Sequence, residues 1–290
     1  MATAQFINQA SLGGLFYFLG ERTFNSVTIG ISTVNLNHQI LRPYGAFPHP
    51  NVLAFFFLLT AVMILTRITH EKVISWRIIL AAGLIFSSAG LALTFSRASI
   101  LLGIIFFLCC FLIRIARPTR MTLLGVLTGI FAGFGALVML GQLGSFSGGQ
   151  FLLRGIDFRE ELLNQSVKIF SESPYFGIGL NNFFVYQTQL IKTISPVAFQ
   201  PPHNILVIAL LSLGLFGWWI VPTVFVTAIR SILNNLRTTN DELRIFHQSI
   251  LFLIVSIVIV GMFDHFFLTV EQGQVILALI LGLSFARITA

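Results

Sequence analysis

The chain has 290 residues, of which 56% are hydrophobic and only 9% are charged. Soluble domains carry about a quarter charged residues, so this chain, with a mean hydropathy of +0.91, could not cover a water-exposed surface. The net charge of +7 does not indicate nucleic acid as a partner, because the basic residues are spread between apolar runs. Composition therefore predicts an integral membrane protein with membrane lipids around it.

Apolar segments of about 20 residues are long enough to cross a bilayer as helices. They predict an all-α fold, a polytopic transmembrane bundle of about seven spans, which makes the whole chain (1–290) one integral membrane domain. The expected spans, in chain order, are 51–67, 77–95, 98–115, 121–143, 204–229, 246–263 and 270–287.

One long connection, residues 144–203, separates the fourth and fifth expected spans. An acidic capping pattern at Asp157 predicts a helix start. Leu163, Val167 and Phe170 then recur at the spacing of one helix face. We expect a short amphipathic helix here, lying near the membrane surface. Loops of this length between spans are uncommon unless they have a function.

The basic residues set the expected orientation. Ten of the 17 Lys and Arg residues fall on one side if the seven spans alternate, and that side is predicted to be cytoplasmic. The connection 144–203 is then extracytoplasmic. The other seven basic residues are expected on the outer face: Arg22, Arg42, Arg97, Arg154, Arg159, Lys168 and Lys192.

The expected topology does not explain why arginines lie on the outer face. Arg97 lies between two apolar spans, where it either snorkels to the headgroups or faces a cavity of the bundle. Arg154 and Arg159 lie near the beginning of the long connection. They are either solvated side chains at the start of a helix or ligands of an anion. Arg42 precedes a Pro/Gly-rich turn before the first span.

Three further polar positions lie next to predicted span ends. His203 follows two prolines and precedes Asn204, which suits a helix N-cap; the histidine is either a polar anchor or a group that exchanges a proton. His49 similarly begins or caps the first span. Asp264 either pairs with an outer arginine or orients a base.

These side chains favour an anion site without metal or cofactor. No Cys/His cluster has metal-ligand spacing in the sequence, and no P-loop or dinucleotide-binding pattern is present. Arginine forks match phosphate oxygens bidentately. The implied ligand is a phosphate group presented from the membrane.

Four stretches, in this order, are "LRPYGAFPHPNVLAFFF", "LTFSRASILLGI", "SPYFGIGLNNF" and "PPHNILVIALLSLGLFGWW". Through these stretches and "FDHFFLTVEQGQVILALILGL", the chain resembles the O-antigen ligase and O-antigen polymerase family of bacterial membrane glycosyltransferases. The resemblance covers nearly the whole chain. Family members usually begin with several more spans, which this chain is expected to lack.

The resemblance implies a location in the bacterial cytoplasmic membrane with the active face outward. It also implies metal-free transfer of a glycan from an undecaprenyl-diphosphate-linked oligosaccharide to a hydroxyl of an acceptor glycan, lipid or protein. Arg97 and one arginine at the start of the loop would hold the diphosphate. Arg154 is preferred over Arg159 for this second position. His203 would activate or orient the acceptor, with Arg42, His49, Asn204 and Asp264 as possible support.

Two other functions stay open at this stage. A transporter or flippase of a lipid-linked or anionic solute would carry ionisable or helix-breaking groups near the bilayer midplane, and the span centres hold almost none. A non-catalytic assembly protein is the third reading. Polymerase and ligase are not distinguished by these residues.

Overall fold

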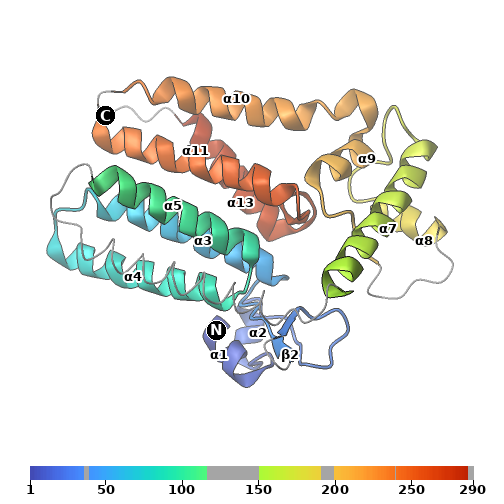
Figure 1. The fold of residues 1–290 in the computed structure, drawn as a ribbon, viewed down its shortest axis with the longest axis horizontal. Helices are drawn as coiled ribbons and strands as arrows, with labels where there is room; N and C mark the ends of the chain where they lie inside the picture. The colour runs from blue at the N-terminus through green and yellow to red at the C-terminus, as the bar shows by residue number, and fades with distance from the viewer. Residues whose placement is uncertain (36–38, 116–149, 191–198, 239, 287–290) are drawn as a thin grey trace. The chain divides into compact units, whose positions relative to one another are not determined.

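The computed structural model describes residues 1–35, 39–115, 150–190, 199–238 and 240–286. The described chain is mainly α-helical, with one short pair of strands (Figure 1), which confirms the predicted all-α membrane class. It divides into two compact units, Met1–Ser147 and Gly148–Ala290, which are described separately. The expectation of one integral membrane domain stays a prediction.

Three apolar helices form the main part of the first unit: α3 (Pro50–Ile68), α4 (Ile74–Leu93) and α5 (Arg97–Ile115). Helix α3 packs against both others and has 61% of its most apolar window buried, against 28% for α4. α3 is therefore the central helix, and α4 presents a largely exposed apolar surface. The three helices lie where the sequence predicts them.

The polypeptide before α3 folds around one buried amide, Gln5. Its Nε2 donates to Glu21 Oε1 (2.6 Å), and its Oε1 accepts from the backbone N–H groups of Tyr44 and Gly45 (3.0 and 2.7 Å). These bonds tie the first helix to the turn that precedes α3. The short elements of this region are α1 (Ala2–Asn8), α2 (Leu15–Phe18) and the antiparallel strands β1 (Thr33–Asn35) and β2 (Gln39–Leu41).

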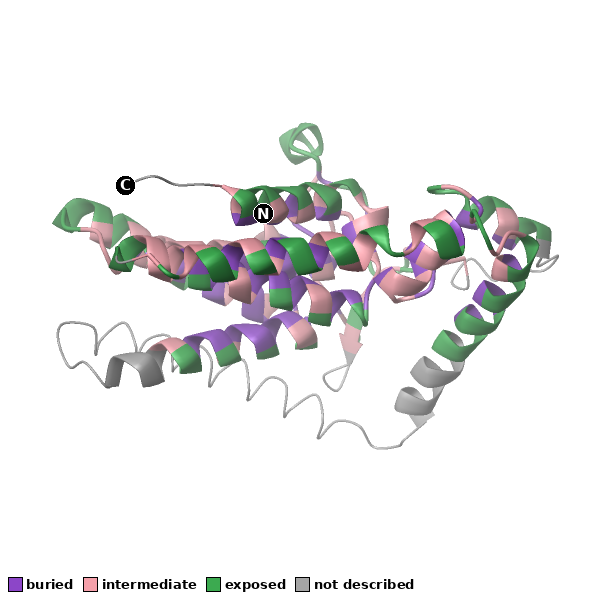
Figure 2. Cartoon of the chain, turned by 90° about the horizontal axis from the view of Figure 1, so that it is seen from above, coloured by how far each residue is buried: buried purple, intermediate pink, exposed green. Residues whose placement is uncertain are grey.

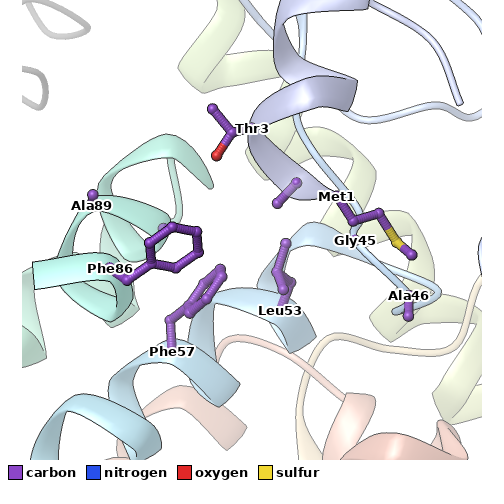
Figure 3. Close-up of a pocket in the computed structure, with 10 residues that line it drawn as sticks. Met1, Thr3, Gly45, Ala46, Leu53, Phe57, Phe86 and Ala89 are labelled. Carbon is purple, nitrogen blue, oxygen red and sulfur yellow. The ribbon is translucent and has the colours of Figure 1, made fainter. Parts of the chain in front are cut away.

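An apolar cavity of about 290 Å³ lies between α1, α3 and α4 of the first unit (Figure 3). Leu53, Phe57 and Phe86 point toward it, and Thr3 is among the few polar side chains that line it. The side chains that line this cavity are mainly hydrocarbon.

The second unit has two parts. Helices α10, α11 and α13 pack against one another, with short α12 against α13 and α9. Helix α7 packs against α8 and α9. The elements are α7 (Gln150–Glu172), α8 (Phe183–Leu190), α9 (Ile205–Gly217), α10 (Ile220–Asn235), α11 (Asp241–Gly261), α12 (Phe266–Thr269) and α13 (Glu271–Phe285).

The prediction of one continuous span over 204–229 is wrong. Helices α9 and α10 meet at a bend of 100°, which is visible at the right of Figure 1. Gly214 has φ +66° and ψ −175°, a conformation that other residues rarely adopt. The helix ladder is broken there, and the carbonyls just before the break lose their helical partners.

A segment of the 144–203 connection supplies those partners. The backbone N–H groups of Ile178 and Gly179 donate to the carbonyls of Leu211 and Ser212 (2.8 and 3.0 Å). In return, the N–H groups of Leu215 and Phe216 donate to the carbonyls of Pro174 and Tyr175 (2.9 and 3.1 Å). We call this pairing of 174–179 with 211–216 the backbone clasp.

Two glycines make the clasp possible because they face each other without side chains. A Cβ on Gly177 would lie 2.5 Å from backbone atoms of Ser212 and Gly214, and a Cβ on Gly214 would collide with the backbone of Tyr175 and Gly177. Both residues also have positive φ. Glycine is required here on two independent grounds.

Helix α7 confirms a helix in the connection, but it begins at Gln150, earlier than the expected start at Asp157. Its protein-facing side carries the buried residues Leu162 and Ile169. Val167, on the face expected from the sequence, is exposed (67%), and exposed positions recur along this helix in Figure 2. Two stripes therefore run along α7, one packed and one uncovered.

Three described helices, α3, α4 and α11, are long and apolar enough to cross a membrane, or four if the bent pair α9–α10 counts as one span. Helix α13 and the described apolar part of α5 are shorter. The expected span 121–143 lies outside the described residues. The membrane class is thus confirmed, and the count of seven stays a prediction.

Candidate functional site

His203 lies immediately before α9, in a turn whose geometry is set by its neighbour Asn204. The Asn204 side chain caps α9 by accepting from the N–H groups of Leu206 and Val207 (2.9 and 3.2 Å). Its amide also donates to the carbonyl of Met262, just after α11 (3.3 Å). The N-cap expected at Asn204 is confirmed, and the second bond brings the end of α11 beside His203.

A cluster of three ionisable side chains results. The rings of His203 and His265 lie with centroids 5.2 Å apart, and one side-chain atom each of His203, Asp264 and His265 fall within 4.8 Å of one another. Asp264 is only 9% exposed, and its Oδ1 accepts from the backbone N–H of His265 (2.8 Å). We call these three residues the His–Asp–His cluster.

His265 is held in place by Thr269, one helical turn further along the chain. Nδ1 of His265 lies 2.6 Å from the Thr269 hydroxyl oxygen, and that hydroxyl donates to the His265 carbonyl (3.1 Å). When the hydroxyl gives its single proton to the carbonyl, Nδ1 of the neutral histidine is the donor to the hydroxyl oxygen. Nε2 then carries the lone pair.

Both histidines are neutral near pH 7. Burial lowers the pKa of His203, the Asp264 carboxylate raises it, and the positive charge of Arg159 lowers it again, with a net decrease. Burial likewise lowers the pKa of His265 to about 4, with Asp264 opposing and His203 adding to the decrease. A neutral imidazole near a carboxylate can accept a proton, because the carboxylate stabilises the imidazolium that forms.

The same three side chains have the composition of a metal-ligand set, since two imidazoles and a carboxylate are common zinc ligands. No ligand spacing indicates this set in the sequence, because His203 is far along the chain from Asp264 and His265. However, Nδ1 of His265 is already bonded to Thr269, so only Nε2 of that ring remains for a metal. The cluster thus fits acid–base chemistry directly and a metal only through that nitrogen.

Arg42, in the first unit, has a structural role. Its guanidinium donates to the carbonyl of Thr94 (2.7 Å), the hydroxyl of Ser32 (3.0 Å) and the amide oxygen of Asn51 (2.7 Å). These bonds join the turn before α3 to the turn between α4 and α5. Arg42 therefore fixes the backbone from which Arg97 extends.

Arg97 begins α5, and its side chain is exposed. The preceding turn includes Phe95 at φ +53°. Only residues 94–96 separate α4 from α5, in agreement with the short gap between the expected spans 77–95 and 98–115. His49 caps α3 by accepting from the N–H of Asn51 (3.2 Å), which confirms the capping alternative for this residue.

Within the second unit, the structure brings together His203, Asn204 and Asp264, with Arg159 near enough for its charge to act on His203. Arg154 belongs to α7, but its side chain lies outside the described residues. Arg42, His49 and Arg97 belong to the first unit.

Sequence reasoning did not select His265 or Thr269 as site residues. Their signals were weak but present: His265 adjoins Asp264, and the spacing from His265 to Thr269 is one helical turn.

Residues 82–221 match the family model described as O-antigen ligase. This match supports assignment of the chain to the O-antigen ligase family. No curated protein and no solved structure matches the chain.

This family match supports a role in polysaccharide assembly and a glycosyltransferase-like activity. The O-antigen ligase family implies lipid-linked oligosaccharides and acceptor glycans as partners in general. The family match and the apolar helices together indicate a bacterial inner-membrane protein. The match includes Arg97, Arg154, Arg159 and His203, whereas Asp264 and His265 follow it.

Proposed function

We propose that this O-antigen ligase family protein transfers a glycan from an undecaprenyl-diphosphate-linked donor to an acceptor sugar hydroxyl, at the outer face of the membrane and without a metal. The observation that carries the proposal is the His–Asp–His cluster at the start of α9. It combines a neutral, half-buried His203 with a nearly buried Asp264 and the positive charge of Arg159.

In the proposed reaction, the acceptor oxygen attacks the anomeric carbon of the donor sugar. A new C–O bond forms, and the bond from that carbon to the diphosphate oxygen breaks with its electron pair leaving on the diphosphate. The acceptor proton passes to His203, and Asp264 stabilises the resulting imidazolium. His203 later returns the proton to water.

The departing diphosphate needs positive charge. Arg97, Arg154 and Arg159 are the proposed holders of its oxygens, because fixed cations stabilise charge that develops in a transition state. Arg159 is supported by its electrostatic effect on His203. Arg97 is proposed from the resemblance of the stretch "LTFSRASILLGI" to the family.

Transport is the competing function, and the bent pair α9–α10 is the observation that favours it, because transporters bind solutes at broken helices. In this chain the carbonyls of Leu211 and Ser212 at the break accept from Ile178 and Gly179. The break is thus satisfied by the protein's own backbone, which supports a structural role for it.

The test uses the purified full chain in liposomes with an undecaprenyl-diphosphate oligosaccharide and candidate acceptors. We expect product on a gel, as a ladder for a polymerase or a single addition for a ligase. His203→Ala should lower the rate at least about 100-fold, the lower range for general-base catalysis. His70→Ala, which changes a histidine outside the cluster, is the matched control.

Normal-length product from His203→Ala would refute the role of His203. Movement of the lipid-linked donor across the membrane without product, equally fast in both variants, would instead favour the transporter.

A further inference from the structure

Three aromatic side chains gather where the clasp joins the bend between α9 and α10. The Tyr175 ring stacks on Phe216 (centroids 5.9 Å apart), and the Phe176 ring packs on the same side chain (5.5 Å). All three are uncovered, with exposed fractions of 58% for Tyr175, 77% for Phe176 and 69% for Phe216. We call Tyr175, Phe176 and Phe216 the aromatic tip.

Water is a poor environment for this surface. Burying a side chain such as phenylalanine is worth about 1.5–3 kcal/mol, and a contiguous exposed apolar patch normally marks an interaction site. The stretch "PYFGIGL" (174–180) has no Asp, Glu, Lys or Arg, so no charge opposes its transfer to a less polar medium.

Several backbone groups around the tip have protein partners. Irregular backbone is tolerated at membrane depth only where its polar groups have protein partners. The clasp satisfies the N–H groups of Ile178 and Gly179 and the carbonyls of Pro174 and Tyr175. Gly177 donates to the Ser173 carbonyl (3.0 Å) and accepts from the Ser173 hydroxyl (2.8 Å).

The tip is also continuous with a surface that is already apolar and exposed. Phe216 belongs to the bent pair α9–α10, which qualifies by length and hydropathy as a broken span or re-entrant segment. Trp219 and Ile220, at the bend of that pair, are 64% and 59% exposed. Aromatic side chains are enriched at the membrane–water interface.

We propose that the aromatic tip inserts into the membrane–water interface, so that lipid, and not a protein or a glycan, covers Tyr175, Phe176 and Phe216. Because the clasp connects the tip to the end of α7 and to α9, insertion of the tip also fixes the depth of these two helices. Helix α7 carries Arg159, and α9 begins beside His203. The His–Asp–His cluster is thereby held at a fixed depth relative to lipid headgroups. This proposal rests on the membrane class of the chain and not on its catalytic assignment.

The test is electron paramagnetic resonance of the full chain in liposomes. With Cys109 and Cys110, the two cysteines of the chain, replaced by serine, a nitroxide is placed at Phe176→Cys. The matched control is Glu172→Cys, at an exposed position just before the tip. Collisions are measured with oxygen, which concentrates in lipid, and with a water-soluble nickel chelate.

We expect oxygen to dominate at position 176 and the nickel chelate to dominate at position 172. Equal nickel access at the two positions would place the tip in water and overturn the proposal. Exclusion of both reagents at 176 would identify protein as the cover and overturn the proposal as well.

A second measurement avoids the bulky label. Phe176→Trp is made with Trp76, Trp218 and Trp219 replaced by phenylalanine, so that position 176 gives the only indole fluorescence. We expect quenching by lipids brominated near the headgroup and little quenching by aqueous iodide. The reverse pattern in a protein with unchanged melting temperature would overturn the proposal.

Discussion

Replacing Gly177 with alanine tests whether the backbone clasp holds the connection against the broken helix. Positive φ costs a residue with a Cβ about 1–2 kcal/mol, and Gly177 has φ +72°. The new Cβ would lie 2.5 Å from backbone atoms of Ser212 and Gly214, which cannot rotate away as a side chain could. The two segments of the clasp must therefore separate.

Separation breaks at least the two bonds donated by Ile178 and Gly179, at about 1 kcal/mol each. Together with the strain, Gly177→Ala should reduce the free energy of unfolding by about 3–4 kcal/mol, in the upper range for single substitutions. Gly30→Ala is the control, because Gly30 has a similar φ of +75° but nothing within 4 Å of the added Cβ. It should lose only the strain.

The assay is thermal unfolding in detergent, combined with hydrogen exchange of peptides that contain Ile178 and Gly179. Gly177→Ala should melt well below Gly30→Ala and should exchange those two amides faster, while Gly30→Ala leaves them protected. If both variants shift the melting temperature equally and protect the amides equally, the Cβ collision is not real and the clasp does not form as described.

Three further predictions concern charge and metal. Burial alone would raise the pKa of Glu21, but hydrogen bonds from Gln5, Leu12 and Gly13 and the charge of the N-terminal amino group outweigh it and lower the pKa from 4.5. The resulting stabilisation is present above pH 4.5 and is lost as the pH falls through the folded-state pKa. Between pH 3 and 7, melting temperatures should therefore fall in acid for the wild type and fall less for Glu21→Gln, and equal acid profiles would contradict this. Arg42→Lys loses the guanidinium fork, and with two charged hydrogen bonds gone at about 1.5 kcal/mol each its unfolding free energy should drop by about 3 kcal/mol; an unchanged melting temperature would show that the fork is dispensable. Chelation with EDTA should leave the rate of glycan transfer unchanged, whereas loss of the rate with recovery on adding zinc would show that the His–Asp–His cluster works as a metal site.

Sequence patterns predicted the helices well where a single segment determines its own structure. The apolar runs of α3, α4 and α11 are long enough to be recognised by composition alone. Local capping chemistry was equally readable, because His49 and Asn204 each bond to N–H groups only two or three residues away. These features depend on neighbours in the chain.

The features that the sequence did not predict depend on partners far along the chain. Arg42 looked like a candidate anion ligand, yet Thr94 accepts from its guanidinium. His265 joins the site through a ring contact with His203. Neither pairing has a periodicity or a fixed spacing by which it could be recognised in one sequence.

The bend between α9 and α10 shows this limit most clearly, because both halves of the signal were visible. Gly214 lies within an apolar run, where a glycine usually costs a helix about 1 kcal/mol and no more, and Gly177 lies in a turn-rich stretch where glycine is ordinary. Each alone is consistent with a continuous helix and a loose loop. Only when the two backbones meet does the absence of both Cβ atoms become a requirement. The carbonyls freed by the bend then receive the N–H groups of the loop, so the broken helix and the ordered connection are one structural feature, formed from two segments that give no joint signal in the sequence.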